Sequence, residues 1–322
     1  MRSLSYLSQI FLFLCFASLL LIVSCANLGP KTLKSERSNY NVAVQRTNDE
    51  ELLLNLVRLK YRDTPFFMEV SSMASQFILS TKANASASLQ NGVKGLFGLG
   101  GSLGVTEKPT VTYSPLQGDR FIQRVLSPLP LDTITLLFNS GWNIERIFRL
   151  CFQRMNNLKN APGASGPTPS RSPYFIEFIS AVKYLRLLQI EDAINLSYQE
   201  ENGVPQLILN INDADKNRAE ARQFALAANV EPGKTRYVLA FSADSNKTNH
   251  IRVVTRSLLG IMFYISQAVE VPSKDISKGK VTQTQTRDGK IFDWDKVMGD
   301  LLKIRSASEK PQEYPMTIFY RG

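Results

Sequence analysis

The sequence predicts an α+β fold, with a helix-rich N-terminal half carrying a long β-hairpin of small residues and a mixed α/β C-terminal half. Three patterns support this prediction. Apolar residues recur at helical spacing from Leu52 to Leu59, side-chain character alternates from Phe77 to Gln90, and short strand and helix patterns follow one another after residue 173. Of the 322 residues, 43% are hydrophobic and 20% are charged, which is the composition of a globular protein.

The first predicted helix begins at Thr47–Glu50, where Thr-Asn-Asp-Glu has the spacing of a capping box. It is expected to end between Tyr61 and Thr64, because Pro65 disfavours helical geometry in the residue before it. From Phe66 the pattern becomes that of a strand, and residues 66–70 are predicted to be extended.

The segment from Phe77 to Tyr113 is predicted to form a long hairpin. Odd-numbered residues of its first arm are apolar or small, while the even-numbered residues from Ser80 onward are polar. Residues 91–95, Asn-Gly-Val-Lys-Gly, have the composition of a turn. The return arm repeats the alternation less regularly, because Glu107 and Pro109 interrupt its apolar phase. Such alternation is also typical of a strand pair in a membrane barrel.

The elements expected after the hairpin come from helical spacing, alternation and turn residues. The predicted helices are 117–126, 131–138, 143–158 with Asn143 as its cap, 174–189, 214–228, 257–269 and 294–304. The predicted strands are 194–198, 206–211, 237–241, 251–254 and 316–320, with a hairpin turn at 201–203.

Composition divides the chain into five predicted parts. Residues 1–24 are a signal peptide, 25–45 a polar tether, 46–160 a domain of helices and the long hairpin, and 173–322 a mixed α/β domain. Residues 161–172 separate the two domains, because the run of alanine, glycine, serine and proline from 161 to 169 has the composition of a linker.

The N-terminus predicts export. Arg2 gives a positive start, residues 10–23 form an apolar run, and Ser24 precedes Cys25; the run is too short to be a membrane-spanning helix. The segment Ile22-Val23-Ser24-Cys25 resembles the lipobox of bacterial lipoproteins. That resemblance implies cleavage between Ser24 and Cys25 and acylation of Cys25, and Ala26 then favours the outer membrane, on its periplasmic face. The inner membrane and the cell surface remain open.

The net charge and the residue types limit the partners and the kinds of site that the chain is expected to have. The formal net charge is +10, which suits anionic lipid, cell-wall polymer or an acidic partner, while export argues against nucleic acid. A single histidine, His250, and a lone mature cysteine, Cys151, make no zinc or copper cluster, so no metal or cofactor is expected. Gly233-Lys234-Thr235 lacks the earlier glycine of a phosphate-binding loop, and no catalytic motif is present.

Arg146, Arg149 and Arg154 share the more polar side of the predicted helix 143–158, and they form a candidate anion-binding group. Carboxylate pairs that would suit a glycosidase are Glu50–Glu51, Glu200–Glu201 and Asp293 with Asp295. At helix starts and turns such residues are usually solvated.

Residues 58–72 and 257–264 are similar to segments of an uncharacterised group of lipoproteins of Gram-negative bacteria. The resemblance implies a lipid-anchored envelope protein and no particular activity. It also implies that the chain continues past Gly322. The leading functional prediction is therefore a non-enzymatic protein that binds envelope components or assembles with itself. Two alternatives stay open: a subunit of an oligomeric outer-membrane channel that contributes hairpin 77–113, and a hydrolase acting on cell wall or lipid.

Overall fold

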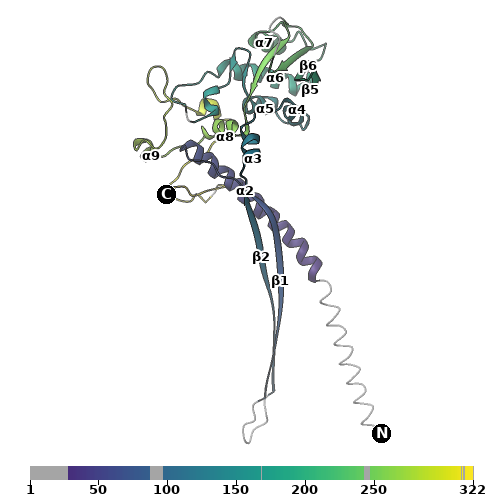
Figure 1. Cartoon of the computed structure of the whole chain (residues 1–322), viewed down its shortest axis with the longest axis vertical. Helices are drawn as coiled ribbons and strands as arrows, with labels where there is room; N and C mark the ends of the chain where they lie inside the picture. The colour runs from purple at the N-terminus through teal and green to yellow at the C-terminus, as the bar shows by residue number, and fades with distance from the viewer. Residues whose placement is uncertain are drawn as a thin grey trace, which may run out of the picture. The chain divides into compact units, whose positions relative to one another are not determined.

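The computed structural model describes residues 28–321 apart from 88–96, 168, 243–246, 313 and 315. The predicted signal peptide, Cys25 and the hairpin turn at 91–95 lie outside the described residues. The chain divides into two compact units: residues 1–54 with 310–322, and residues 55–309. Figure 1 shows the elements in chain order. The fold is α+β as predicted, with helices mainly in the first half.

Helix α2 (Leu28–Lys60) begins well before the helix start predicted at Thr47, and it includes most of the segment predicted to be a tether. Residues 28–45 are helical, because beyond Pro30 they include no glycine or proline that would break a helix. Thr47 lies inside this helix, and its hydroxyl donates to the carbonyl of Val44 at 2.9 Å instead of capping a new one. Arg46 also forms an ion pair at 3.0 Å with Glu50, which lies one turn farther along the same helix.

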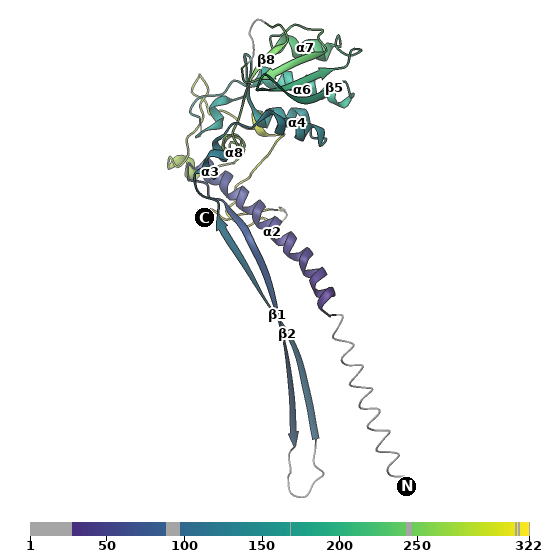
Figure 2. The ribbon, with the colours of Figure 1, turned by 45° about the vertical axis from the view of Figure 1, so that its right-hand side comes forward.

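The long hairpin is confirmed and is longer than the sequence pattern indicated. Strand β1 (Met68–Ala87) pairs antiparallel with β2 (Phe97–Pro115) along its whole length, with one bulge between Val70 and Ser72. The two strands lie side by side in both views of the chain (Figures 1 and 2). At about 3.3 Å per residue, the 20 residues of β1 extend about 65 Å.

The remaining strands form one six-stranded sheet in the order β4-β3-β8-β7-β6-β5. Neighbouring strands are antiparallel except for β7 and β8, which are parallel. The strands are β3 (Phe152–Met155), β4 (Leu158–Lys159), β5 (Ile194–Glu201), β6 (Val204–Ile211), β7 (Arg236–Ala240) and β8 (His250–Thr255). Strand β8 alternates buried and exposed residues, as expected for a sheet with one covered face.

Eight described helices follow the hairpin along the chain. They are α3 (Asp119–Leu126), α4 (Leu131–Asn139), α5 (Ile144–Cys151), α6 (Ile176–Ile190), α7 (Ala219–Ala227), α8 (Leu258–Ser266), α9 (Ser273–Ser277) and α10 (Asp295–Met298). The core joins residues of α4 to α7 with inward residues of the sheet, among them Phe148, Phe178 and Leu239. No described helix is both long enough and apolar enough to cross a membrane.

The predicted boundary at 161–172 is wrong. Strands β3 and β4 precede it and β5 to β8 follow it, yet all belong to one sheet and one core. Ala161 and Ala164 are fully buried, and residues 162–165 form a 3-10 turn, η1, inside the body. The small residues of this segment allow close packing, which composition cannot distinguish from flexibility.

The predicted helix 143–158 ends early, at Cys151. Asn143 caps it as expected, its side chain accepting from the N–H of Glu145 at 2.8 Å. At the other end the backbone N–H of Arg256 donates to the Cys151 carbonyl at 2.7 Å, and the chain then pairs with β8 as β3. The partner that ends the helix is distant in sequence, so helical spacing could not predict it.

Two C-terminal predictions are also corrected. Residues 316–320 form no strand, because no described strand pairs with them. Of the helix expected over 294–304, only α10 forms; Gly299 follows it at once, and the chain turns so that Ile304 bridges to Val269.

Candidate functional site: the hairpin and its root

The register of the hairpin places like residues together. Leu79 is opposite Val105, Ala83 opposite Gly101 and Ala85 opposite Leu99. Residues opposite one another in an antiparallel pair lie on the same face of the ribbon. The apolar phases predicted for the two arms therefore share one face from residue 79 to 87 and from 97 to 105, and no charged residue occurs on it. The other face carries Lys82 opposite Ser102.

Both outer edges of the ribbon lack a partner strand within the described chain, since β1 and β2 form a two-stranded sheet by themselves. Pro109 indicates which backbone groups face outward. The register runs through Ser75–Pro109 without a shift, and an edge strand accommodates proline where its missing N–H would face away from the partner. Inward and outward positions alternate along each strand. Odd-numbered residues from 75 to 87 and from 97 to 109 are therefore the ones with outward backbone groups.

The root of the ribbon is held to the body by a buried asparagine. Asn55 is fully buried on α2; its Nδ2 donates to the carbonyl of Phe66 at 2.7 Å and its Oδ1 accepts from the Phe66 N–H at 2.9 Å. The next residue, Phe67, meets Phe121 of α3 edge to face at 5.8 Å between ring centroids. The N–H of Leu116 donates to the Phe67 carbonyl at 3.0 Å, so both strand ends are fixed at one place.

Asn55 is not among the functional residues that the sequence patterns predict. It lies three residues after Leu52 and four before Leu59, on the apolar side of the helix. A polar residue in an apolar stripe is the signal that could have identified it, because a buried amide needs hydrogen-bond partners.

Lys60, at the end of α2, is a second buried polar group beside the root. Its Nζ donates to Oε1 of Gln267 at 3.0 Å, and burial lowers the pKa of Lys60 from 10.5 to about 8. The next residue contacts a different element: the Tyr61 hydroxyl donates to Asp275 at 2.7 Å, and Lys280 pairs with the same carboxylate at 2.6 Å.

The lowered pKa of Lys60 predicts a pH-dependent stability. Between pH about 8 and about 10.5 the unfolded chain holds a proton on Lys60 that the folded chain has released, so the free energy of unfolding should rise with pH. The expected rise is about 3 kcal/mol. Urea unfolding at pH 7, 8.5 and 10 measures it. Lys60→Met should remove the rise, whereas the exposed Lys296→Met should keep it; an equal rise in the wild type and Lys60→Met would contradict the assignment.

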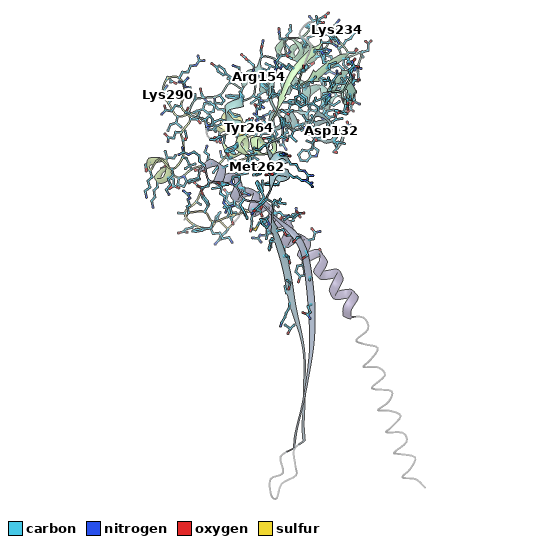
Figure 3. The ribbon with its side chains drawn as sticks, viewed as in Figure 1. Asp132, Arg154, Lys234, Met262, Tyr264 and Lys290 are labelled. Carbon is cyan, nitrogen blue, oxygen red and sulfur yellow. The ribbon has the colours of Figure 1, made fainter. Side chains whose placement is uncertain are left out.

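The three candidate anion-binding arginines do not converge. Arg149 is buried; its two terminal nitrogens contact both oxygens of Asp300 at 2.7 and 2.8 Å, and Nη1 also reaches Glu145 at 3.1 Å. Arg146 is exposed on α5, and Arg154 is exposed on β3, beyond the end of the helix (Figure 3). Arg149 is therefore a structural ion-pair residue, and the remaining two do not form a group with it.

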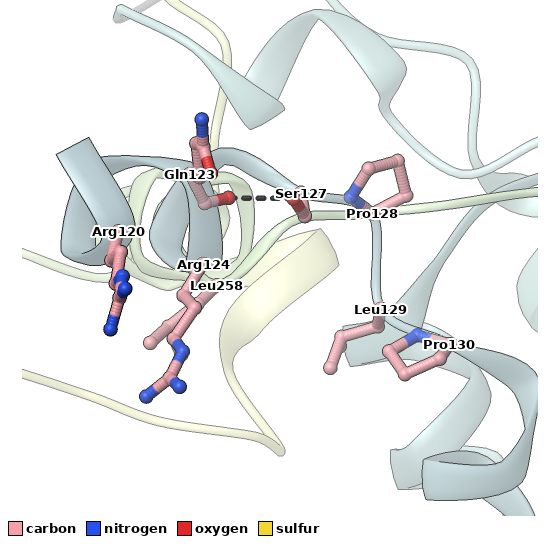
Figure 4. Close-up of a pocket in the computed structure, with 8 residues that line it drawn as sticks. All are labelled: Arg120, Gln123, Arg124, Ser127, Pro128, Leu129, Pro130 and Leu258. Carbon is pink, nitrogen blue, oxygen red and sulfur yellow. Dashed lines mark hydrogen bonds between the residues drawn. The ribbon is translucent and has the colours of Figure 1, made fainter.

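A shallow cleft of about 420 Å³ lies beside α3. Its lining residues are Arg120, Gln123, Arg124, Ser127, Pro128, Leu129, Pro130 and Leu258. In Figure 4 the side chains of Arg120 and Arg124 extend to the same side of the helix, and the Ser127 hydroxyl donates to the Gln123 carbonyl at 2.6 Å. Within the described part of the chain, no ion pair joins either arginine to a carboxylate.

The other chemical candidates are dispersed. Cys151 is buried, and burial raises the pKa of its thiol to about 12. His250 is half-buried at the start of β8. Glu200, Glu201, Asp293 and Asp295 are exposed, and Glu50 with Glu51 lies within α2. No cluster of three histidine, cysteine or carboxylate residues occurs among the residues described.

Comparisons with protein-family models, with curated proteins and with solved structures give no match for this chain.

Proposed function

We propose that the protein is a non-enzymatic component of the bacterial envelope that assembles with copies of itself through the β1–β2 ribbon. In this proposal an acyl group on Cys25 holds each copy at the outer membrane. The observation that carries the proposal is a long antiparallel ribbon whose two outer edges have no partner in the described chain.

The outer edges of the ribbon favour an assembly of several copies over a single copy with an isolated ribbon. A lone two-stranded hairpin is marginally stable in water, and its outer edges present rows of backbone donors and acceptors to other strands. Proteins usually shorten or cover such edges, whereas this ribbon extends about 65 Å. Pairing with the ribbon of another copy gives those backbone groups partners.

The register supports a second candidate function, a subunit of an outer-membrane channel. Residues 79–87 and 97–105 form a segment with one uncharged face and one polar face that includes Lys82. The length of each arm of this segment is close to the about 9–11 residues that a tilted strand needs to cross a bilayer. A closed ring of such segments would turn the uncharged face to lipid and Lys82 to water. Conductance of the purified assembly in a planar bilayer tests this version; an assembly without conductance would remove it.

The proposal is tested by shortening the ribbon. In the variant, Asn-Gly replaces residues 79–105 and joins Ile78 to Thr106, an inward pair that can be hydrogen-bonded as a two-residue turn requires, so the root pairs and Asn55 are unchanged. The masses of both proteins are measured after extraction in mild detergent. We expect a discrete multiple of one chain for the full protein and a single copy for the variant, with the same unfolding of the body. A single copy in both, or the same multiple in both, would contradict the proposal.

A further inference from the structure

The two edges of the ribbon are protected near the root. The bulge at Val70–Ser72 interrupts β1, and Pro109 follows Glu107 and Lys108 in β2. Bulges, prolines and edge charges are the devices by which proteins prevent strands from pairing with other chains. Close to the body, therefore, neither edge is suited to continuous pairing.

Farther from the root these devices are absent. Residues 73–87 and 97–106 contain no proline and a single charged residue, Lys82, and the register runs through them without a shift. Both edges of this distal segment offer uninterrupted outward backbone groups at the odd-numbered positions. The contrast along one ribbon indicates that its distal segment is the part that pairs.

We infer that the partner is a second copy of this chain and that β1 of one copy pairs with β2 of the next along the distal segment. The inference rests on the proposed function. Copies related by rotation about one axis direct their ribbons the same way, so β1 of one copy runs antiparallel to β2 of its neighbour. A β1–β1 contact between such copies would be parallel, which is the less stable pairing, and would leave the β2 edges free.

Pairing of β1 with β2 has a consequence for the assembly. Each copy uses two different edges, so the contact is head-to-tail and repeats until a ring closes. A two-fold dimer is not expected, because antiparallel β1–β1 pairing needs ribbons that point in opposite directions.

Cysteine cross-linking tests the edge assignment. One tagged copy carries Ala83→Cys and a second, differently tagged copy carries Gly101→Cys; Leu99→Cys and Leu103→Cys cover offsets of two residues on the same face. No copy holds two engineered cysteines, so every bond between them joins two copies. Cys151 is buried and unreactive in all of them. The two forms are produced together and oxidised in the full-length assembly.

We expect disulfide-linked pairs between Ala83→Cys and at least one of the β2 variants, and none between two Ala83→Cys copies. Links between two Ala83→Cys copies, or an intact assembly with no β1–β2 links, would overturn the edge assignment while self-assembly stands. A chain that runs as a single copy before oxidation would overturn the proposed function itself. Val111→Cys, in the protected root, is the matched control and should form no link with Ala83→Cys.

Discussion

Replacing Arg256 with methionine is expected to lower the free energy of unfolding by about 3–5 kcal/mol. The side chain of Arg256 is fully buried after β8. Its Nη1 donates to the carbonyls of Arg149 and Phe152 at 2.9 and 2.7 Å, Nη2 donates to the Asn160 carbonyl, and Nε reaches the hydroxyl of Ser165 at 2.9 Å. Methionine would leave these buried oxygens with fewer donors.

The position also has an electrostatic role. The carbonyls of Arg149 and Leu150 belong to the last turn of α5, where a positive charge is favourable. The guanidinium carbon lies 3.9 Å from the ring centre of Tyr264, and burial lowers the pKa of Arg256 only to about 10, so it stays charged at neutral pH. The guanidinium of Arg256 provides both a positive charge and a planar set of N–H donors, whereas lysine provides the charge without that planar set. Arg256→Lys should therefore recover only part of the stability that Arg256→Met loses.

Urea unfolding of the full chain, followed by the fluorescence of Trp142 and Trp294, measures this effect. Arg252→Met is the matched control, since Arg252 is exposed on the same strand, and it should change the free energy of unfolding by less than about 0.5 kcal/mol. If Arg256→Met and Arg252→Met unfolded at the same urea concentration, the arginine would not be what joins α5, η1 and β8.

The second large effect is expected from single prolines in β1. Ala83 is at an outward position and Asn84, the next residue, at an inward one. Ala83→Pro should therefore keep the hairpin ladder but remove a donor from the outer edge, and the assembly should shift toward single copies. Asn84→Pro should instead disrupt pairing between β1 and β2. Val111→Pro, an outward change in the protected root, should leave the assembly intact.

Two measurements separate these outcomes: the mass in mild detergent, and the strand content from circular dichroism. For Ala83→Pro the mass should fall while the strand content of the ribbon persists. A mass unchanged by Ala83→Pro would mean that the outer edge of β1 is not part of the interface.

The sequence predicted the elements whose signals are local. The hairpin over 77–113, the cap at Asn143, and the β5–β6 pair with its turn at 201–203 all follow from alternation, capping or turn residues, and all are present. The register then adds what alternation alone could not show, namely that the apolar phases of the two arms lie on one face.

The predictions that were wrong depended on contacts between distant residues. The helix from Asn143 stops at Cys151 because the backbone N–H and side chain of Arg256 donate to its last carbonyls. In the segment predicted as a linker, Ala161 and Ala164 are buried, and the Ser165 hydroxyl accepts from Nε of Arg256. Arg149 appeared to be a surface arginine until Asp300, distant in sequence, provided its buried ion pair. Spacing and composition contain no information on partners that are so far apart along the chain.

The central claim, that the outer edges of the ribbon pair between copies, is tested most directly by amide hydrogen exchange resolved to single residues over 73–87 and 97–107. In a single copy, only inward amides at even-numbered positions are bonded within the ribbon. In the assembly, the odd-numbered amides should be protected as well. The predicted result is that amides at odd and even positions are both protected from exchange in the native assembly. In Ala83→Pro, only the amides at even positions should stay protected. Rapid exchange at the odd-numbered positions of the native assembly would contradict the claim.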